Sequence, residues 1–446
     1  MKCFYIFIIL SLHILTTSSF SMQLIRDVEL EEFSKELLLP LTKTSNLEKD
    51  RVDLYFINSN DVNAFVTSGQ HIFTNTELII QSSTYDEYLG VLAHELSHIN
   101  GGHVSRTKEK ISKLGDKSLP IYLLGILGTL TGQVDVGLAA IMVGSASVQD
   151  GYLYYSRTQE AAADQAAVAL LCKSAQPVQG LESFLKKLDR SSLENAEDYK
   201  YKTTHPQTSD RYNWIISSYK KYPNCKYKLN DDLQRRFELI KGKLFAYTHS
   251  EKETLAIYSG KNTAEAQYAM ATIYLLNGNY NKAIKSIKSL ISSEENNPYF
   301  HEMLAEIYFS IGKHNLAILE QRKVIRLMSV ENDLQLMILA NYLLAEASKE
   351  SLIAAIKALN KSLFLNPNNS YAWFLLAKGY ALTGDLALAQ YASSERYYLR
   401  GDKALALSML KKAIKNIDNN SVEWYRANDL LYILTDKVEN ADDKKR

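Results

Sequence analysis

The 446-residue sequence is poor in cysteine, has almost no net charge, and lacks a long apolar run at its amino terminus. Its three cysteines are too few for a zinc site of four thiolates, so any bound metal must be held mainly by histidine and carboxylate. The formal net charge of +1 gives no basic field, so nothing predicts binding to nucleic acid. Charged residues make up 23% and hydrophobic residues 46%, which argues against a disordered chain and against a polytopic membrane protein.

The first 21 residues have the pattern of a secretory signal peptide. Lys2 supplies the positive charge, residues 3–14 form a short apolar run, and Ser19 and Ser21 are small residues suited to cleavage. An uncleaved membrane anchor is the alternative, but the run is shorter than the roughly 20 residues that cross a bilayer. We therefore predict cleavage after Ser21 and export of the remaining chain.

Cys172 and Cys225 remain after this cleavage. In an oxidising compartment such a pair can be joined by a disulfide. Two unrelated buried thiols are the alternative, and the sequence does not choose between them.

The segment 22–245 begins with a helical pattern and then changes to strands. The stretches 53–57 and 62–73 have the alternating or apolar composition of short strands joined by turns. The helix before them is indicated within 22–55 by apolar residues at helix spacing, namely Leu30, Phe33, Leu37 and Leu38.

The next predicted helix has signals at both ends. Thr84, followed three residues later by Glu87, predicts a capping box at its start. Gly101 and Gly102 end it. This helix carries the most informative motif of the chain.

Residues 119–148 are rich in Leu, Ile, Gly and Ala and are interrupted by Gln133 and Asp135. Each half is too short to span a bilayer alone, so both halves are predicted to be buried or surface-sheltering helices. A membrane-inserted hairpin is the alternative. Peripheral contact of 119–148 with a membrane is a further expectation. The following helix, 152–172, has an alanine face that would let another helix approach closely, formed by Ala161, Ala162, Ala163, Ala166, Ala167 and Ala169.

The second half of the sequence repeats itself. The phrase from Gly278 to Ala283 recurs from Gly312 to Ala317, 34 residues later, which is the tetratricopeptide period. We predict about four helix pairs in a repeat domain at 246–440, following a metallopeptidase domain at 22–245. An ordinary helical bundle is the alternative.

His94-Glu95-Leu96-Ser97-His98 is an H-E-x-x-H motif inside the capped helix. Histidines at positions i and i+4 lie on one helix face, so both imidazoles can reach one metal ion. Glu95 is placed to act on a water molecule held by the metal. His94 and His98 are therefore predicted metal ligands, and Glu95 is the predicted catalytic base.

A catalytic zinc ion needs a third protein ligand. His103 follows His98 with a spacing one residue short of the metzincin pattern, and a continued helix would put it on the opposite face from His94, so we interpret it as structural or as a supporting residue. Glu160 on the alanine-rich helix is the predicted ligand. Asp164, one turn later, would orient a ligand histidine through its free N–H.

These motifs resemble the HtpX-like and CAAX-prenyl-protease-like zinc peptidases, whose H-E-x-x-H motif pairs with a downstream E-x-x-x-D helix. The resemblance rests on residues 94–98, 156–164 and 63–73. It implies a gluzincin-type fold, mainly α with a small β-sheet, here followed by an α-solenoid of tetratricopeptide repeats. It also directs attention to His205 in Thr204-His205-Pro206, either as an inhibitory ligand of the metal or as a catalytic group that stabilises the oxyanion.

The resemblance further implies a periplasmic zinc endopeptidase with one Zn²⁺ per chain. Its polypeptide substrates would be unfolded or misassembled outer-membrane proteins, and its repeats would contact the outer-membrane assembly machinery. A non-proteolytic scaffold or chaperone with a structural or vestigial zinc site is the rival interpretation, since repeat surfaces bind clients equally well. Glu95 separates the two, because a structural zinc site has no use for a general base.

Overall fold

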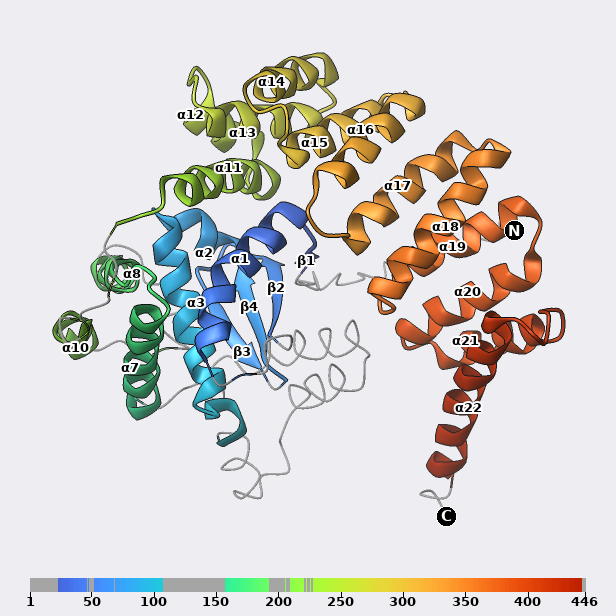
Figure 1. Cartoon of the computed structure of the whole chain (residues 1–446), viewed down its shortest axis with the longest axis horizontal. Coiled ribbons are helices and arrows are strands. Elements are labelled where there is room, and N and C mark those ends of the chain that lie inside the picture. Colours follow the sequence, from blue (N-terminus) through green and yellow to red (C-terminus); the bar gives the residue numbers. More distant parts are fainter. Residues whose placement is uncertain are drawn as a thin grey trace, which may run out of the picture.

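The protein is described by a computed structural model that covers residues 23–45, 47, 52–67, 69–106, 157–191, 205, 209–219, 222, 225 and 228–442. The predicted signal peptide, residues 1–21, and the apolar segment 119–148 lie outside this part of the chain. Among the helices that the structure describes, none is long and apolar enough to cross a membrane. The predicted fold class is confirmed, because a mainly helical region with a small sheet is followed by a curved array of helix pairs (Figure 1).

The sheet has four strands in the order β1-β2-β4-β3. Strand β2 is antiparallel to β1 and parallel to β4, and β4 is antiparallel to β3. Within the described part of the chain, β3 is therefore an edge strand. The strands are β1 (Gln23–Ile25), β2 (Asp53–Asn58), β3 (Ala64–Thr67) and β4 (His71–Asn75).

Six described helices complete this first region. Helices α1 and α3 contact the sheet, α7 and α8 contact α3, and α10 contacts α7. All four apolar residues that predicted the first helix are buried in α1. The helices are α1 (Val28–Thr44), α2 (Thr76–Gln81), α3 (Tyr85–Asn100), α7 (Arg157–Lys173), α8 (Gln179–Ser191) and α10 (Ser209–Tyr219).

Two glycines let α8 approach α3 closely. A Cβ atom on Gly90 would lie 2.7 Å from the backbone of Leu181, and one on Gly180 would lie 2.0 Å from the backbone of Asp86. Since backbone atoms cannot move aside cheaply, both positions require glycine on steric grounds. This contact fixes α3, which carries the H-E-x-x-H motif.

The predicted capping box at the start of α3 is wrong. Thr84 is the N-cap residue, but its side chain makes no capping hydrogen bond. Glu87 instead accepts hydrogen bonds from the Ser83 N–H at 2.7 Å, from the Ser183 hydroxyl at 2.6 Å and from the Lys187 ammonium at 2.7 Å. Contacts with α8 therefore replace the local cap.

The predicted alanine face of α7 is only partly correct. Ala163 and Ala167, one turn apart, are fully buried where α7 packs on α3, whereas Ala161, Ala162 and Ala166 are exposed. The buried stripe is narrow because Glu160 and Asp164 share that face of the helix. Small residues still permit the close approach that the sequence indicated.

The second region is a solenoid of helix pairs that curves away from the sheet (Figure 1). Consecutive helices pack on each other along the array. The helices are α11 (Asp231–Thr248), α12 (Glu251–Tyr258), α13 (Ala264–Leu276), α14 (Tyr280–Ser293), α15 (Pro298–Ser310), α16 (His314–Leu327), α17 (Asp333–Glu346), α18 (Lys349–Leu365), α19 (Ser370–Thr383), α20 (Leu386–Leu399), α21 (Lys403–Ile414) and α22 (Val422–Asp442).

The repeated glycine marks the turn between two helices of a pair. Gly278, Gly312 and Gly384 have φ between 71° and 87°, a left-handed conformation that ends a helix without a Cβ clash. Gly401, with φ of 80°, takes the same conformation in the turn from α20 to α21. Ala347 takes the same conformation, with φ of 63°, in the pair α17–α18. The repeat signal is therefore a backbone requirement, which explains why it could be read from the sequence.

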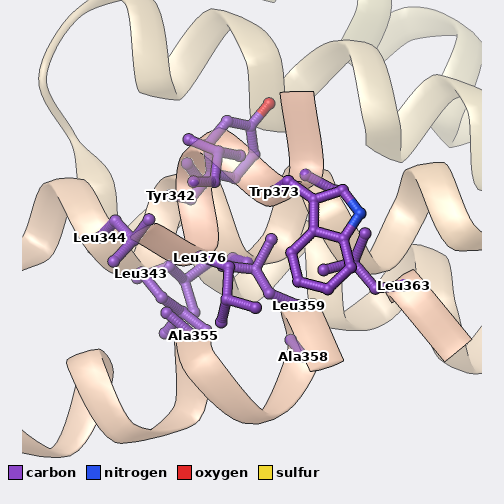
Figure 2. Close-up of a cluster of buried hydrophobic side chains, with 14 of the residues drawn as sticks. Tyr342, Leu343, Leu344, Ala355, Ala358, Leu359, Leu363, Trp373 and Leu376 are labelled. Atoms are coloured by element: carbon purple, nitrogen blue, oxygen red, sulfur yellow. The ribbon is translucent and has the colours of Figure 1, made fainter. Parts of the chain in front are cut away.

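The core of the array is formed by leucine, alanine and aromatic side chains from adjacent helices. Figure 2 shows one section, in which side chains of α17, α18 and α19 interdigitate. The labelled residues are Tyr342, Leu343, Leu344, Ala355, Ala358, Leu359, Leu363, Trp373 and Leu376.

Helix α11 joins the two regions. Its Phe237 and Ile240 belong to the core around the sheet, while Leu239 belongs to the core of the repeats. The predicted domain boundary between residues 245 and 246 falls inside this helix.

A buried ion cluster reinforces this junction. The Lys243 ammonium of α11 lies 2.7 Å from carboxylate oxygens of both Asp27 and Glu29, at the start of α1. The Tyr268 hydroxyl of α13 donates a hydrogen bond to Glu29 at 3.1 Å. One ammonium group thus ties the amino-terminal segment to the repeats.

Cys172 and Cys225 form a disulfide. It connects the carboxyl end of α7 to the segment that leads from α10 to α11. The bond closes a loop with a sequence separation of 53 residues, which contains α8 and α10.

Candidate metal centre

Four buried side chains converge between α3 and α7. His94 and His98 lie one turn apart on α3, Glu160 lies in the first turn of α7, and His205 precedes α10. All four side chains are fully buried. One donor atom from each lies within 4.8 Å of the others, and together they could hold a metal ion.

Several distances between donor atoms are close to those of a tetrahedral site. Donors about 2.0–2.1 Å from a tetrahedral zinc ion lie about 3.3 Å from one another. His94 Nε2 lies 3.0 Å from His98 Nε2 and 3.4 Å from Glu160 Oε2, and His98 Nε2 lies 3.3 Å from Glu160 Oε1. His205 Nδ1 lies 3.3 Å from His94 Nε2 and 3.2 Å from Glu160 Oε1. Three imidazoles and one carboxylate at these separations could hold a metal ion, and this donor set is one that zinc accepts.

Asp164 lies against the first histidine of the motif. Its Oδ1 lies 3.0 Å from His94 Nδ1, the nitrogen that faces away from the other donors. A carboxylate at this position fixes the imidazole ring and increases its basicity.

Arg211 of α10 was missed by the sequence analysis. Its guanidinium donates to both Asp164 oxygens, at 2.6 and 2.8 Å, and lies 2.9 Å from Glu160 Oε2. This bidentate contact holds two carboxylates that are one turn apart on α7. An available signal was the excess of acidic groups at the predicted site, since buried carboxylates need a cationic partner.

The charges of the site are mutually stabilised. Burial lowers the pKa of His94, but the carboxylates of Asp164 and Glu160 outweigh it and raise that pKa to about 9. Burial favours the neutral form of Glu160, yet the surrounding histidines, His205 foremost, hold its pKa far below the ordinary value. Arg211 likewise outweighs burial and keeps the pKa of Asp164 low. Both carboxylates are therefore ionised at neutral pH.

Glu95 is placed beside the four donors without being one of them. Its side chain is fully buried, and neither carboxylate oxygen accepts a hydrogen bond from the described residues. Burial raises the pKa of Glu95 to about 7. A carboxylate with this pKa can accept and return a proton near neutral pH.

His205 connects the donors to the edge of the sheet. Its Nε2 lies 3.4 Å from the carbonyl oxygen of Ala64 in β3 and 3.3 Å from Glu95 Oε1. Its Nδ1 faces the other donors. The same imidazole therefore contacts the predicted base, the predicted ligands and the edge strand.

His103 lies outside the group of donors. The helix α3 ends at Asn100, so the extrapolation along a continued helix does not hold. The chain turns at Gly102, and His103 Nδ1 comes to lie 3.0 Å from His98 Nδ1. The side chain is buried, in keeping with a supporting position.

Comparison with known proteins agrees with this geometry. The model of peptidase family M48 matches residues 26–217. The beta-barrel assembly-enhancing protease of Escherichia coli (strain K12) is 24% identical over 417 residues, covering 91% of this chain and 83% of that protein. The protein of the same name from Yersinia pestis is 26% identical over 418 residues, with the same coverage.

Among solved structures, the crystal structure of MamA is 20% identical and has a TM-score of 0.28. It covers 39% of this chain and 97% of the MamA chain. The match to family M48 includes the H-E-x-x-H motif, the E-x-x-x-D helix, His205 and Arg211. Residues 26–217 therefore resemble the peptidases of family M48, and the chain is a metallopeptidase similar to the beta-barrel assembly-enhancing proteases.

Proposed function

We propose that the protein is a zinc-dependent endopeptidase that holds one zinc ion per chain through His94, His98 and Glu160. The observation that carries this proposal is the group of four buried donor atoms within 4.8 Å of one another, with the buried Glu95 carboxylate beside it. A purely structural site would have no role for that carboxylate. Asp164 is the supporting residue of His94.

When bound, zinc supplies Lewis acidity that polarises a peptide carbonyl and lowers the pKa of water towards 7. Glu95 accepts the proton of the attacking water and then donates it to the leaving amine. The pKa of about 7 suits Glu95 to both steps. Arg211 and Asp164 keep Glu160 and His94 fixed during the reaction.

His205 is proposed to hold the enzyme latent. With its Nδ1 among the donors, it would be a fourth ligand of the metal ion and would exclude a substrate carbonyl or water from that position. Displacement of His205 would open this position and free the imidazole to stabilise the oxyanion. Since His205 also contacts Ala64, its release would change the surroundings of β3 at the same time.

Strand β3 is the proposed substrate-binding element. An extended peptide can add to the free edge of a sheet through main-chain hydrogen bonds, which favours unfolded or loop segments over folded ones. The residues of β3 are buried in this structure, so binding requires a rearrangement. Displacement of His205 is the rearrangement that we propose.

The name of the similar proteases supports a role in the assembly of β-barrel proteins. We therefore propose unfolded or misassembled outer-membrane proteins as substrates and the periplasm as the location, reached with the cleaved signal peptide 1–21. The repeats at 246–440 would contact the assembly machinery, and the domain at 22–245 would cleave. Segment 119–148 would provide peripheral membrane contact.

The test is zinc content and casein degradation by the mature chain and two variants. Glu95→Gln should keep about one zinc ion and lose cleavage by roughly 10²–10⁴-fold, since it removes general acid–base catalysis alone. His205→Ala should keep zinc on three ligands and cleave faster than wild type. Absence of zinc from the wild-type protein would contradict the proposal.

The rival function is that of a scaffold or chaperone in which the repeats bind clients and the zinc site is structural or vestigial. It is favoured if wild type and His205→Ala both bind zinc and unfolded clients but neither cleaves. In that outcome Glu95→Gln should behave as wild type in client binding.

A further inference from the structure

The turn after α3 brings His103 back against the metal centre. Gly101 N–H donates to the carbonyl of Ser97 and Gly102 N–H to that of Ile99, both at 2.9 Å, which closes the helix. Gly102 has a φ of 61°, the left-handed conformation that reverses the chain direction. His103 then begins a new helical turn with its imidazole facing His98.

Gly101 provides the space for this ring. A Cβ atom on Gly101 would lie 2.5 Å from His103 Nε2 and 2.9 Å from its Cδ2 and Cε1. The backbone of Gly101 itself has φ of −70° and ψ of −11°, which any L-residue adopts without strain. Glycine is therefore required at position 101 because a side chain would clash with the His103 ring, and not because of its backbone conformation.

The contact between the two imidazoles has a defined direction. His98 Nε2 points to His94 and Glu160, so a metal ion held there would use the lone pair of this nitrogen. The proton of the neutral His98 ring then sits on Nδ1, 3.0 Å from His103 Nδ1. For this contact to be a hydrogen bond, His98 donates and His103 accepts, which leaves the His103 proton on Nε2.

We propose that His103 is the positioning residue of His98, just as Asp164 is that of His94. His103 fixes the ring orientation and tautomer of His98, and the missing side chain of Gly101 permits it to do so. The two ligand histidines of α3 thus have unlike partners, a carboxylate for His94 and a neutral imidazole for His98. This inference rests on the zinc site of the proposed function.

The first test measures zinc affinity by competition with a chelator, in the Glu95→Gln background to prevent cleavage. His103→Leu removes the acceptor and should weaken zinc binding by about 10–100-fold, the usual effect of losing such a partner. His103→Asn places an amide oxygen where Nδ1 was and should recover affinity to within about threefold of the parent. His314→Gln, far along the repeats, is the matched control and should bind zinc as the parent does.

The second test uses Gly101→Ala, which alters no polar group. The added methyl group must displace the His103 ring, so zinc affinity should fall in the same direction as in His103→Leu. The double variant should bind zinc no more weakly than His103→Leu alone, since there is no longer a ring to displace.

A third readout is the tautomer of each ring in the zinc-loaded protein, measured by ¹⁵N NMR of labelled histidine. His98 should carry its proton on Nδ1 and His103 on Nε2. A His103 proton on Nδ1 would overturn the proposal.

Two further outcomes would also reject it. Zinc affinity of His103→Leu within twofold of the parent, with unchanged thermal stability, would show that His98 needs no such partner. The third outcome is that the fold-losses of zinc affinity caused by Gly101→Ala and by His103→Leu multiply in the double variant. That result would show that the two substitutions act independently. Failure of the parent itself to bind zinc would instead refute the proposed function and this inference together, so the two failures are distinguishable.

Discussion

The two regions of the protein are held together in different ways. In the repeat array, each helix packs mainly on its neighbours in the chain, and the core is mostly apolar, with a few buried polar side chains such as Gln321 and Gln335. In the peptidase region, residues as far apart as His94 and His205 meet, and the centre contains buried histidines, carboxylates and an arginine. The array therefore tolerates local change, whereas the metal centre depends on several distant segments at once.

This contrast predicts how many helices a single substitution should affect in each region. A substitution in the array should disturb one or two helix pairs, since stability there is a sum over neighbours. A substitution in the metal centre should disturb α3, α7 and α10 together. The following predictions test this difference, beginning with the largest expected effect.

Arg211→Met should be the most damaging of these changes. It leaves the ionised carboxylates of Asp164 and Glu160 buried without their cation, which costs about 3–5 kcal/mol in typical proteins. Hydrogen exchange of the metal-free protein should rise in α7 and α10 and stay unchanged in α15 to α19. Arg235→Met, at an exposed ion pair, is the control and should change stability by less than about 1 kcal/mol. Faster exchange throughout the array would contradict the contrast.

Replacing both Cys172 and Cys225 by serine should destabilise the peptidase region by about 2–4 kcal/mol. The disulfide restricts a loop of 53 residues in the unfolded chain, and this loop carries His205 and Arg211. Limited proteolysis should then cut near α8 and α10 before it cuts the repeats. Equal protection in the oxidised protein and the variant would show that packing alone holds this loop.

The junction between the regions should respond to pH. Burial raises the pKa of Glu302 in α15 to about 8, so the folded state retains a proton that the unfolded chain releases. The stability contributed by this proton is complete below about pH 4.5 and is lost as the pH rises through 8. Glu302→Gln keeps the group neutral and should raise the melting temperature by about 2–4 °C at pH 9, by less at pH 6, and not at all below about pH 4.5. The exposed Glu295→Gln is the control.

Ala347→Gly should give the smallest effect, and it should be stabilising. Ala347 has the left-handed conformation that glycine takes at the equivalent turns, so glycine should increase stability by about 0.5–1 kcal/mol. Gly278→Ala is the reciprocal change and should reduce stability by a similar amount. Urea denaturation measures both. A destabilised Ala347→Gly variant would mean that the turns of the array are not interchangeable.

Local signals made much of the fold readable from the sequence. The repeats were indicated by the glycine turns at Gly278 and Gly312, 34 residues apart and both with φ of 71°, and α1 by its apolar spacing. The capping box at Thr84 was wrong because Glu87 meets Ser183 and Lys187, which lie about 100 residues away in the chain. Local patterns do not show that kind of competition.

In the metal centre, too, local spacing predicted some residues and not others. The His94 and His98 imidazoles meet as the helix spacing requires, and Glu160 and Asp164 also lie on one helix face. His205 could be indicated only by resemblance, and Arg211 was not found, because each is brought in by a separate segment. His103 lies in the supporting position that the sequence indicated, although the extrapolation along a continued helix does not hold, because α3 ends at Asn100.

Helix α11 makes the two ends of the repeat array different. An open stack of helix pairs exposes apolar surface at each end unless a terminal element covers it. Here the peptidase region, through α11 and the Lys243 cluster, covers the amino-terminal end of the stack. The peptidase region thus caps the amino-terminal end of the repeat array. Helix pairs added or lost at the carboxyl-terminal end of the array would not contact the residues of the metal centre. The number of helix pairs in the array could therefore change during evolution without a change in the metal centre.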